Sequence, residues 1–222
     1  MCVNIVEGAI HDHQPVGEHT MLSSISKPLS LFLLAVGILV GPRLSNAQST
    51  YEIDAEHSFV TFKVNRFGLV NVVGFFPDIA GHVVLDPSAP LTTTADITIQ
   101  TSTVYMGKSA NRDGAVKGPV FLDVANFPEM TFKMTGVEND GFKNEAVGQL
   151  TIHGTTNEIR LPYEIKGPAK DPTGLTTIAI SGHVVIDRRD YGLGFNRTLG
   201  SGLPFIGNDV DIEINVLAVQ SE

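Results

Sequence analysis

Apolar and polar residues alternate with a period of two along most of the chain beyond residue 50. Between residues 57 and 66, for example, Val60, Phe62 and Val64 alternate with threonine, lysine and asparagine. Successive side chains of a β-strand point to opposite faces of a sheet, so this alternation predicts half-buried strands. Similar segments, separated by Gly, Pro, Asn and Asp, are 51–54, 70–76, 79–85, 94–104, 130–135, 142–153, 159–166, 176–188 and 210–219. We expect about eight antiparallel strands joined by short turns.

Residues 105–133 (YMGKSANRDGAVKGPVFLDVANFPEMTFK) interrupt this alternation. Here the adjacent Arg112 and Asp113 begin a stretch, 113–117, that is long enough for one helical turn. A dense cluster of apolar residues follows, formed by Val120, Phe121, Leu122, Phe127, Met130 and Phe132. A polar pair beside such a cluster suits an amphipathic ligand with a polar head and a long apolar tail. A loop packed over the end of a barrel would show the same pattern.

The strand count and the short turns predict an all-β fold. A meander of eight strands that closes on itself has no exposed edge, and its interior holds side chains or one small ligand. We therefore expect an eight-stranded antiparallel, lipocalin-like barrel with a short helical or irregular insertion. An immunoglobulin-type sandwich is the competing architecture. It fits less well because the chain has no Trp and only one Cys.

Residues 21–47 have the composition of an export signal. From Met21 onward, Lys27 precedes an apolar run at 29–41, and Ser45-Asn46-Ala47 forms a small-x-small cleavage site. The apolar run is shorter than the roughly 20 residues that a membrane-spanning helix needs. The predicted division is a misassigned start or disordered leader at 1–20, a signal peptide at 21–47 and one domain at 48–222. The predicted location is the periplasm, or the exterior of a cell without an outer membrane.

The charge balance of the chain is acidic, with a formal net charge of −9. Residues 48–222 hold 13 basic and 21 acidic residues, which makes binding to nucleic-acid phosphates a poor prospect. The single cysteine, Cys2, lies in the leader. The predicted domain therefore has no disulfide, no thiol nucleophile and no thiolate metal ligand.

Residue patterns that mark common enzyme classes are missing from the sequence. It contains no phosphate-binding glycine loop, serine elbow or H-E-x-x-H zinc motif. The histidines of 48–222 are isolated on different predicted strands, so we expect no metal site, no cofactor and no catalytic residue. Arg112 and Asp113 are either a structural ion pair or part of a head-group site. The phenylalanines of 105–133 either fill the barrel or line an open lumen.

Five motifs follow one another over nearly the whole of 48–222. They are Tyr51-x-Ile53-Asp54-x-x-His57-Ser58 with Phe62, Gly74-Phe75-Phe76 with Gly81, Asn111-x-Asp113 with Phe121 and Phe127-Pro128-x-Met130-Thr131-Phe132, Gly148-x-Leu150-Thr151-Ile152-His153-Gly154-x-Thr156, and Ile186-Asp187-Arg188-x-Asp190-Tyr191-Gly192. Together and in this order they resemble the YceI-like family of polyisoprenoid-binding proteins of bacterial periplasms.

The resemblance implies an extended eight-stranded barrel whose pore holds an isoprenoid chain, such as a polyprenyl diphosphate or a quinone tail. It also implies a binding protein, since members of the family are not known as enzymes. Arg66 stands where the family commonly has His, Gly114-Ala115 replaces the usual His after Arg-Asp, and Val120 replaces an Asp before Phe121. The head-group end is therefore expected to differ, and an arginine at position 66 favours an anionic head.

We predict an exported protein that holds a long-chain isoprenoid or quinone-like lipid, for carriage, storage or stress response. The residues predicted to recognise the head are Arg66, Arg112 and Arg188, and those predicted to contact the tail are Phe75, Phe121, Phe127 and Phe132. His57, Phe62 and Asp113, which belong to the motifs of the resemblance, complete the predicted ligand-binding set. Contact with a membrane surface during lipid exchange, and a homodimer, are compatible with this function.

Two other functions fit the same sequence. The first is a lipid-modifying enzyme that uses the pore, with His57 and Asp113 as acid and base acting on one ligand atom. The second is a structural β-module whose lumen is filled by side chains. A continuous apolar tunnel through the barrel would distinguish the carrier from the structural module.

Overall fold

The computed structural model describes residues 48–221. These residues belong to the second of two units, which begins at Leu44. The predicted leader and signal peptide at 1–47 lie outside the described residues. The elements are β1 (Ser49–Ile53), β2 (Phe59–Arg66), β3 (Val70–Phe76), β4 (Ile79–Leu85), η1 (Pro90–Thr92), β5 (Thr94–Gln100), η2 (Thr101–Thr103), α1 (Ala110–Lys117), β6 (Glu129–Asn139), β7 (Asn144–Ile152), β8 (Thr155–Lys170), β9 (Thr176–Asp187), η3 (Arg188–Tyr191) and β10 (Ile206–Gln220).

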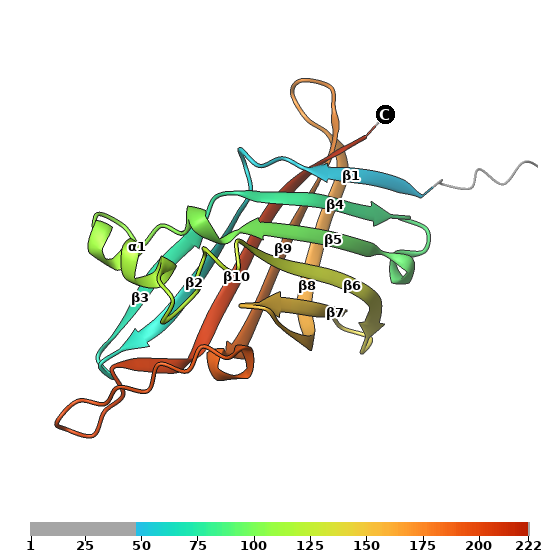
Figure 1. Cartoon of the computed structure of the whole chain (residues 1–222). Helices are drawn as coiled ribbons and strands as arrows, with labels where there is room; N and C mark the ends of the chain where they lie inside the picture. Colours follow the sequence, from blue (N-terminus) through green and yellow to red (C-terminus); the bar gives the residue numbers. More distant parts are fainter. Residues whose placement is uncertain (1–47, 222) are drawn as a thin grey trace, which may run out of the picture. The chain divides into compact units, whose positions relative to one another are not determined.

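The strands form one antiparallel sheet that closes into a barrel (Figure 1). The order is β1-β4-β5-β6-β7-β8-β9-β10-β2-β3, and an additional pairing of β1 with β10 closes the sheet. One edge of β10 pairs with β2 over 206–215 and with β1 over 218–220, so β1 and β2 occupy one position around the barrel. Only Pro77 and Asp78 separate β3 from β4, which share the next position. The ten strands therefore occupy eight positions, and the predicted eight-stranded antiparallel barrel is confirmed.

The alternation of the sequence becomes the inside and the outside of this barrel. Along each strand the apolar side chains face the lumen, as those of Val60 and Ile214 do where β2 pairs with β10. Polar members pair on the outer face, where Lys63 Nζ lies 2.5 Å from Glu213 Oε1. Apolar burial thus fixes the register, because a slip by one residue would turn every apolar side chain toward solvent.

One predicted turn lies earlier in the chain than expected. The β7–β8 hairpin turns at His153 and Gly154, which have φ of 50° and 73°. Residues 155–157, which lie between the predicted strands at 142–153 and 159–166, instead begin β8 and pair with 150–152 of β7. A two-residue hairpin loop with positive φ at both positions matches the twist of the flanking strands, which explains the shorter turn.

The insertion at 101–128 lies beside the outer edge of β3. Phe75 and Tyr105 exchange two backbone hydrogen bonds of 3.0 Å, which attaches the segment to that edge. Val104, Met106 and Leu122 of the insertion are buried in a cluster with strand residues that include Phe76 and Met130. The helix α1 begins earlier than the single turn predicted from 113, and in Figure 1 it lies at the same end of the barrel as the β2–β3 turn. The insertion therefore forms part of one end of the barrel.

Candidate functional site: an apolar cavity with a basic mouth

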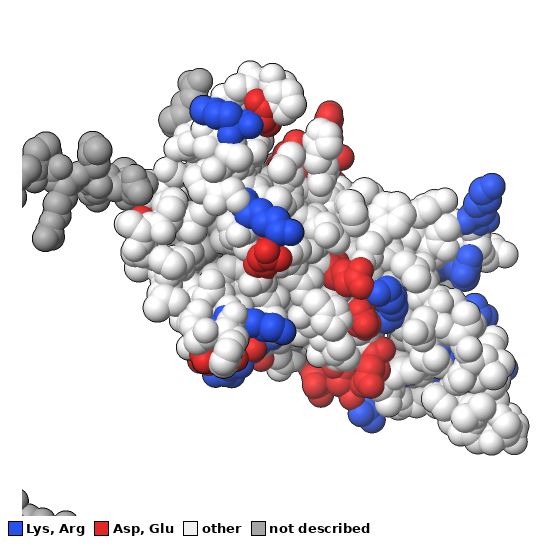
Figure 2. Space-filling model, turned by 180° about the vertical axis from the view of Figure 1, so that it is seen from behind, with Lys and Arg blue, Asp and Glu red and all other residues white. Residues whose placement is uncertain are grey.

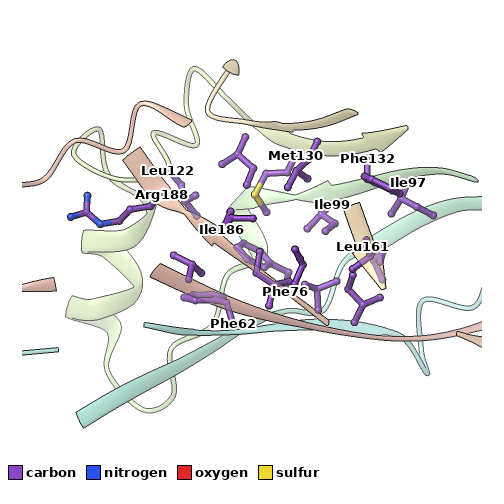
Figure 3. Close-up of a pocket in the computed structure, with 18 of the residues that line it drawn as sticks. Phe62, Phe76, Ile97, Ile99, Leu122, Met130, Phe132, Leu161, Ile186 and Arg188 are labelled. Carbon is purple, nitrogen blue, oxygen red and sulfur yellow. The ribbon is translucent and has the colours of Figure 1, made fainter. Parts of the chain in front are cut away.

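The barrel encloses a cavity of about 530 Å³. Its walls are the inward-facing residues of nearly all of the strands, together with residues of the insertion, and Figure 3 shows part of this lining. A volume of this size lies within the roughly 300–1,000 Å³ that is typical of sites for small ligands. The lining is aliphatic and aromatic almost throughout, so a long apolar chain suits the interior better than a polar solute.

Two glycines give aromatic side chains room to lie flat against the wall. A Cβ at Gly148 would lie 2.6 Å from the Phe132 ring, and a Cβ at Gly74 would lie 2.5 Å from the Phe62 ring. Both rings line the cavity. Because real Cβ atoms do not approach other atoms so closely, a larger residue at either position would push the ring into the lumen. The absence of side chains at Gly74 and Gly148 therefore contributes to the shape of the cavity, together with the inward-facing side chains.

The two ends of the barrel differ. At the far end, Tyr51, Val83, Leu85, Ile178 and Ala218 form a packed cluster in which every residue is at most 5% exposed. At the other end, Asn111 and Ala115 of α1 line the cavity while they are exposed to solvent. The cavity therefore opens at the end where Arg66, Asn111, Arg112 and Phe205 lie, which we call the mouth.

The charged residues of the lining are all basic. Arg66, Arg112 and Arg188 line the cavity, and no Asp or Glu does so among residues 48–221. The Nε of Arg66 is buried without a hydrogen-bond partner. The guanidinium of Arg66 lies 4.6 Å from the centre of the Phe67 ring and 5.4 Å from that of Phe205. A buried donor without a partner costs free energy, which an anionic group at the mouth would relieve.

The sequence matches known proteins over nearly the whole barrel. A family model described as the YceI-like domain matches residues 51–218. The chain belongs to the YceI-like family. A UPF0312 protein of Shewanella sp. is 30% identical over 190 residues, which are 85% of this chain and 98% of that protein. This confirms the resemblance that the five motifs indicated.

Solved structures of YceI-like proteins have the same architecture. A YceI protein of Campylobacter jejuni is 30% identical, with a TM-score of 0.59 over 69% of this chain and 88% of that chain. A polyisoprenoid-binding domain from Saccharophagus degradans is 16% identical, with a TM-score of 0.59 over 79% of this chain and all of that chain. At 16% identity this second likeness concerns the fold alone.

In this YceI-like barrel, Arg188 is held by the protein itself. Its guanidinium donates to the backbone oxygens of Gly207 at 2.9 Å, Phe195 at 2.8 Å and Leu193, and to Oδ1 of Asn208 at 3.0 Å. The residue is 4% exposed, and burial lowers the pKa of its guanidinium. Arg188 therefore anchors the irregular segment between β9 and β10, and four of its five side-chain N–H donors are engaged.

Six residues of the predicted ligand-binding set line the cavity. They are Phe62, Arg66, Arg112, Phe121, Phe132 and Arg188. They come from β2, α1, the rest of the insertion, β6 and η3, so the fold gathers positions that are more than a hundred residues apart in sequence. Of the three arginines, Arg66 and Arg112 make no ion pair with the described residues, and Arg188 is engaged as described above.

Two predicted residues lie away from the cavity because of the strand period. Phe75 faces the outside of β3, where its ring lies 5.2 Å from the Tyr105 ring, while its neighbour Phe76 faces the lumen. The Phe127 ring packs 4.3 Å from the His153 ring at the β7–β8 turn. Both aromatics thus stabilise the attachment of the insertion to the barrel, and neither lines the cavity.

The two residues considered as an acid–base pair are engaged separately. His57 is exposed, and its Nδ1 lies 2.6 Å from Asp54 Oδ2, which raises the pKa of the His57 ring. Asp113 Oδ1 accepts the backbone N–H of Met106 at 2.8 Å. Within residues 48–221 Asp113 forms no ion pair with Arg112, so its structural role is to hold the start of the insertion. Neither His57 nor Asp113 lines the cavity.

Part of the lining lies in segments that looked irregular in the sequence. Met106, Val116 and Leu122 come from the insertion, Phe205 comes from the glycine-rich segment before β10, and Ile206 is the first residue of β10. Ile206 pairs with Arg66, which places Phe205 beside the β2–β3 turn. The only local signal was the presence of aromatic residues among glycines, because the register that brings them to the mouth depends on β2.

Neither a metal site nor a membrane-spanning helix is found in the described part of the chain. No group of three or more His, Cys, Asp or Glu residues is arranged there to hold a metal ion. None of the helices within 48–221 has the length and hydropathy to cross a bilayer.

Proposed function

We propose that this YceI-like protein binds one long-chain amphiphile, with the apolar tail inside the barrel and the polar head at the mouth. The observation that carries the proposal is the continuous apolar cavity, whose charged residues lie at the mouth end. A polyisoprenoid chain fits this geometry. The domain from Saccharophagus degradans that has the same fold is described as polyisoprenoid-binding, so a barrel of this fold is suited to that ligand class.

The head group that suits the mouth is anionic. Arg66 and Arg112 both line the cavity without an ion-pair partner among the described residues, and the lining there includes no carboxylate. A phosphate or carboxylate would supply acceptors for their donors, and hydrogen bonds between charged groups are the stronger kind. We therefore favour a polyprenyl phosphate or diphosphate over a neutral quinone.

Affinity would come mainly from the tail. Burial of apolar surface contributes about 25 cal/mol per Å², from which the ordering of a flexible chain is subtracted. The aliphatic side chains contact the ligand along the whole lumen. Few polar groups are present there to recognise polar groups along the tail. The barrel should consequently select chain length and apolarity more than fine structure, and leave recognition of the head to the mouth.

The proposed role is carriage or storage of such a lipid outside the cytoplasm, including a role under stress. The apolar run at 29–41 and the small residues at 45–47 support export to the periplasm. We propose no catalytic step, since the acid–base pair considered for the pore is engaged elsewhere.

The test is native mass spectrometry of purified residues 48–222, before and after incubation with a polyprenyl phosphate. We expect one lipid per barrel. Leu150→Trp places an indole in the lumen and should abolish loading, because Leu150 lines the cavity. Overpacking costs about 1–3 kcal/mol, so urea unfolding must show that the variant remains folded.

The matched control is Gln149→Trp, which places the same side chain on the outer face of β7. It should load lipid like the parent protein. Failure of the parent protein to take up any isoprenoid, or equal loading of both variants, would refute the proposal.

A further inference from the structure

Two turns form an exposed apolar projection at the mouth end of the barrel. The β2–β3 turn lies against the loop before β10, since a Cβ at Gly68 would be 3.4 Å from Leu203 Cδ1. Leu69 is 81% exposed, Val70 54% and Leu203 44%. We call these three residues the apolar tip. Large apolar side chains grouped on one projection of a soluble fold mark a surface that meets an apolar partner.

The tip is held in place by contacts of Phe67, a residue with an unfavourable backbone conformation. Phe67 has a φ of 64°, a left-handed value that bulky residues rarely adopt. Its N–H donates to Phe205 O at 3.2 Å, and its ring meets the Phe205 ring edge-on at 4.7 Å. Arg66 and Arg197 each lie over the Phe205 ring, at 5.4 and 5.2 Å. The tip is therefore mounted on an organised aromatic and arginine platform.

Basic residues predominate at the end of the barrel that carries the tip, although the domain as a whole is acidic. The segments that build this end, 66–71, the insertion at 101–128 and 193–208, contain five basic residues and two acidic residues. Of the acidic residues, Asp113 accepts the N–H of Met106 and Asp123 accepts a hydrogen bond from the Asn126 side chain. The rest of 48–222 contains eight basic and nineteen acidic residues. In Figure 2 the right-hand end of the molecule, which is the mouth end, shows blue side chains without red ones.

The apolar tip adjoins the opening of the cavity. Arg66 and Phe205 belong to the platform under the tip and also line the cavity. A surface that covers the tip would consequently face the mouth. This continuity links whatever binds the tip to the passage of ligand in and out of the barrel.

We propose that the apolar tip and the basic residues of the same end dock this protein onto an anionic lipid bilayer. Apolar side chains that enter the interface and cations that attract anionic headgroups are the two components of reversible membrane binding. A second copy of the chain is a poorer occupant, because two such ends would bring like charges together. The bilayer would be the source of the lipid that the barrel binds, and this part of the inference rests on the proposed function.

The test is co-sedimentation of residues 48–222 with vesicles of equimolar phosphatidylcholine and phosphatidylglycerol, compared with vesicles of phosphatidylcholine alone. We expect binding to the anionic vesicles that weakens as salt is added. Leu69→Ser together with Leu203→Ser should weaken binding at least about tenfold, since the variant removes the inserted side chains. Lys108→Gln together with Arg197→Gln should weaken it about thirtyfold, from about 1 kcal/mol per cation near the surface.

Matched controls lie at the opposite end of the barrel. Phe142 is 94% exposed in the β6–β7 turn, so Phe142→Ser tests apolar exposure as such. Lys143→Gln together with Lys170→Gln removes the same charge as the basic double variant. Both controls should bind vesicles like the parent protein.

Docking and ligand binding are separable in this design. None of the four substituted tip and basic residues lines the cavity, so native mass spectrometry should show normal lipid loading in the tip variants. Loss of loading with intact vesicle binding would refute the proposed function alone. Absence of vesicle binding in the parent protein, equal binding by tip and control variants, or a tip-dependent dimer without vesicle binding would overturn the docking proposal.

Discussion

At the scale of single residues, the position of each side chain in this barrel depends on its neighbour and on its hydrogen-bond partners. Phe75 and Phe76 are adjacent and identical in type, yet the period of the strand sends one outward and the other into the lumen. Arg66 and Arg188 both line the cavity, yet Arg188 donates to four acceptors of the protein, while Nε of Arg66 has none. Chemical identity alone therefore did not separate a head-group residue from an anchor.

The residue-scale prediction concerns the head group. Arg66→Gln together with Arg112→Gln should weaken binding of a polyprenyl phosphate at least about tenfold, since a hydrogen bond to a charged group contributes about 1.5–3 kcal/mol. Binding of the uncharged polyprenol of the same length should be unchanged. Both affinities are measured by displacement of a fluorescent lipid probe, and the chain has no Trp whose emission would interfere.

The control for this prediction is Arg160→Gln, on the outer face, where Arg160 pairs with Glu138 at 2.9 Å. It should leave both affinities unchanged. An equal loss for the phosphate and the alcohol in the double variant would show that the arginines shape the mouth without reading the head.

At the scale of elements, two shared strand positions and one insertion make the barrel asymmetric, since β1 and β2 share one position and β3 and β4 share the next. β3 continues into β4 across Pro77 and Asp78, so one position around the barrel has two partners along its length. On the side of this position that faces β5, only β4 pairs with β5. The insertion occupies the corresponding edge of β3. The helix α1 and its Arg112 therefore lie at the mouth, where the regular strand pairing stops.

The element-scale prediction concerns Gly81 in β4. It has a φ of 136°, and a Cβ there would lie 2.1 Å from the Asp96 backbone oxygen on β5. Gly81→Ala should destabilise the protein by about 2 kcal/mol or more, because strained backbone costs about 1–3 kcal/mol before any clash is counted. Urea unfolding measures the difference.

Gly136→Ala is the matched control, since Gly136 also lies within a strand but a Cβ there meets nothing within 4 Å. It should change the free energy of unfolding little. Similar effects of the two substitutions would mean that the close approach of β4 to β5 relaxes without cost.

At the scale of the whole molecule, the two ends of the barrel have different tasks. The far end holds a packed cluster with at most 5% exposure, and the mouth end holds the cavity opening and the excess of basic residues. Several carboxylates have a lowered pKa because nearby groups donate hydrogen bonds to them, among them Glu138 and Asp187. The packed end and these hydrogen-bonded carboxylates contribute to stability, and the cavity opening serves binding.

The whole-molecule prediction concerns acid. The pKa of Asp187 is lowered to about 2, first because the Arg189 side chain donates hydrogen bonds to it. Its unfolded pKa is about 3.9, so its stabilisation is complete above about pH 4 and is lost as the pH falls through the folded value. Asp187→Asn should therefore be less stable than the parent protein at neutral pH, and the difference should vanish near pH 2. Thermal unfolding across this range measures it, and a difference that does not change with pH would contradict the assignment.

The sequence by itself determined the all-β class of the fold and favoured a closed barrel over a sandwich, because a period of two over about eight successive segments requires one face of every strand to be buried. It also determined that the interior is apolar, and it placed Phe62, Phe121 and Phe132 on the lining. The turn positions were less well defined, since residues 153–157 allow more than one local conformation. Five ordered motifs gave the family.

Only the tertiary structure decided that the barrel has an open cavity at one end and a packed core at the other. Filling depends on the summed volumes of side chains from every strand and on glycines such as Gly74 and Gly148, which no local pattern records. The structure also decided which arginine lacks a partner and brought the β2–β3 turn beside Leu203. These features arise from pairings between residues more than a hundred positions apart, and the period of a strand carries no information about its partner.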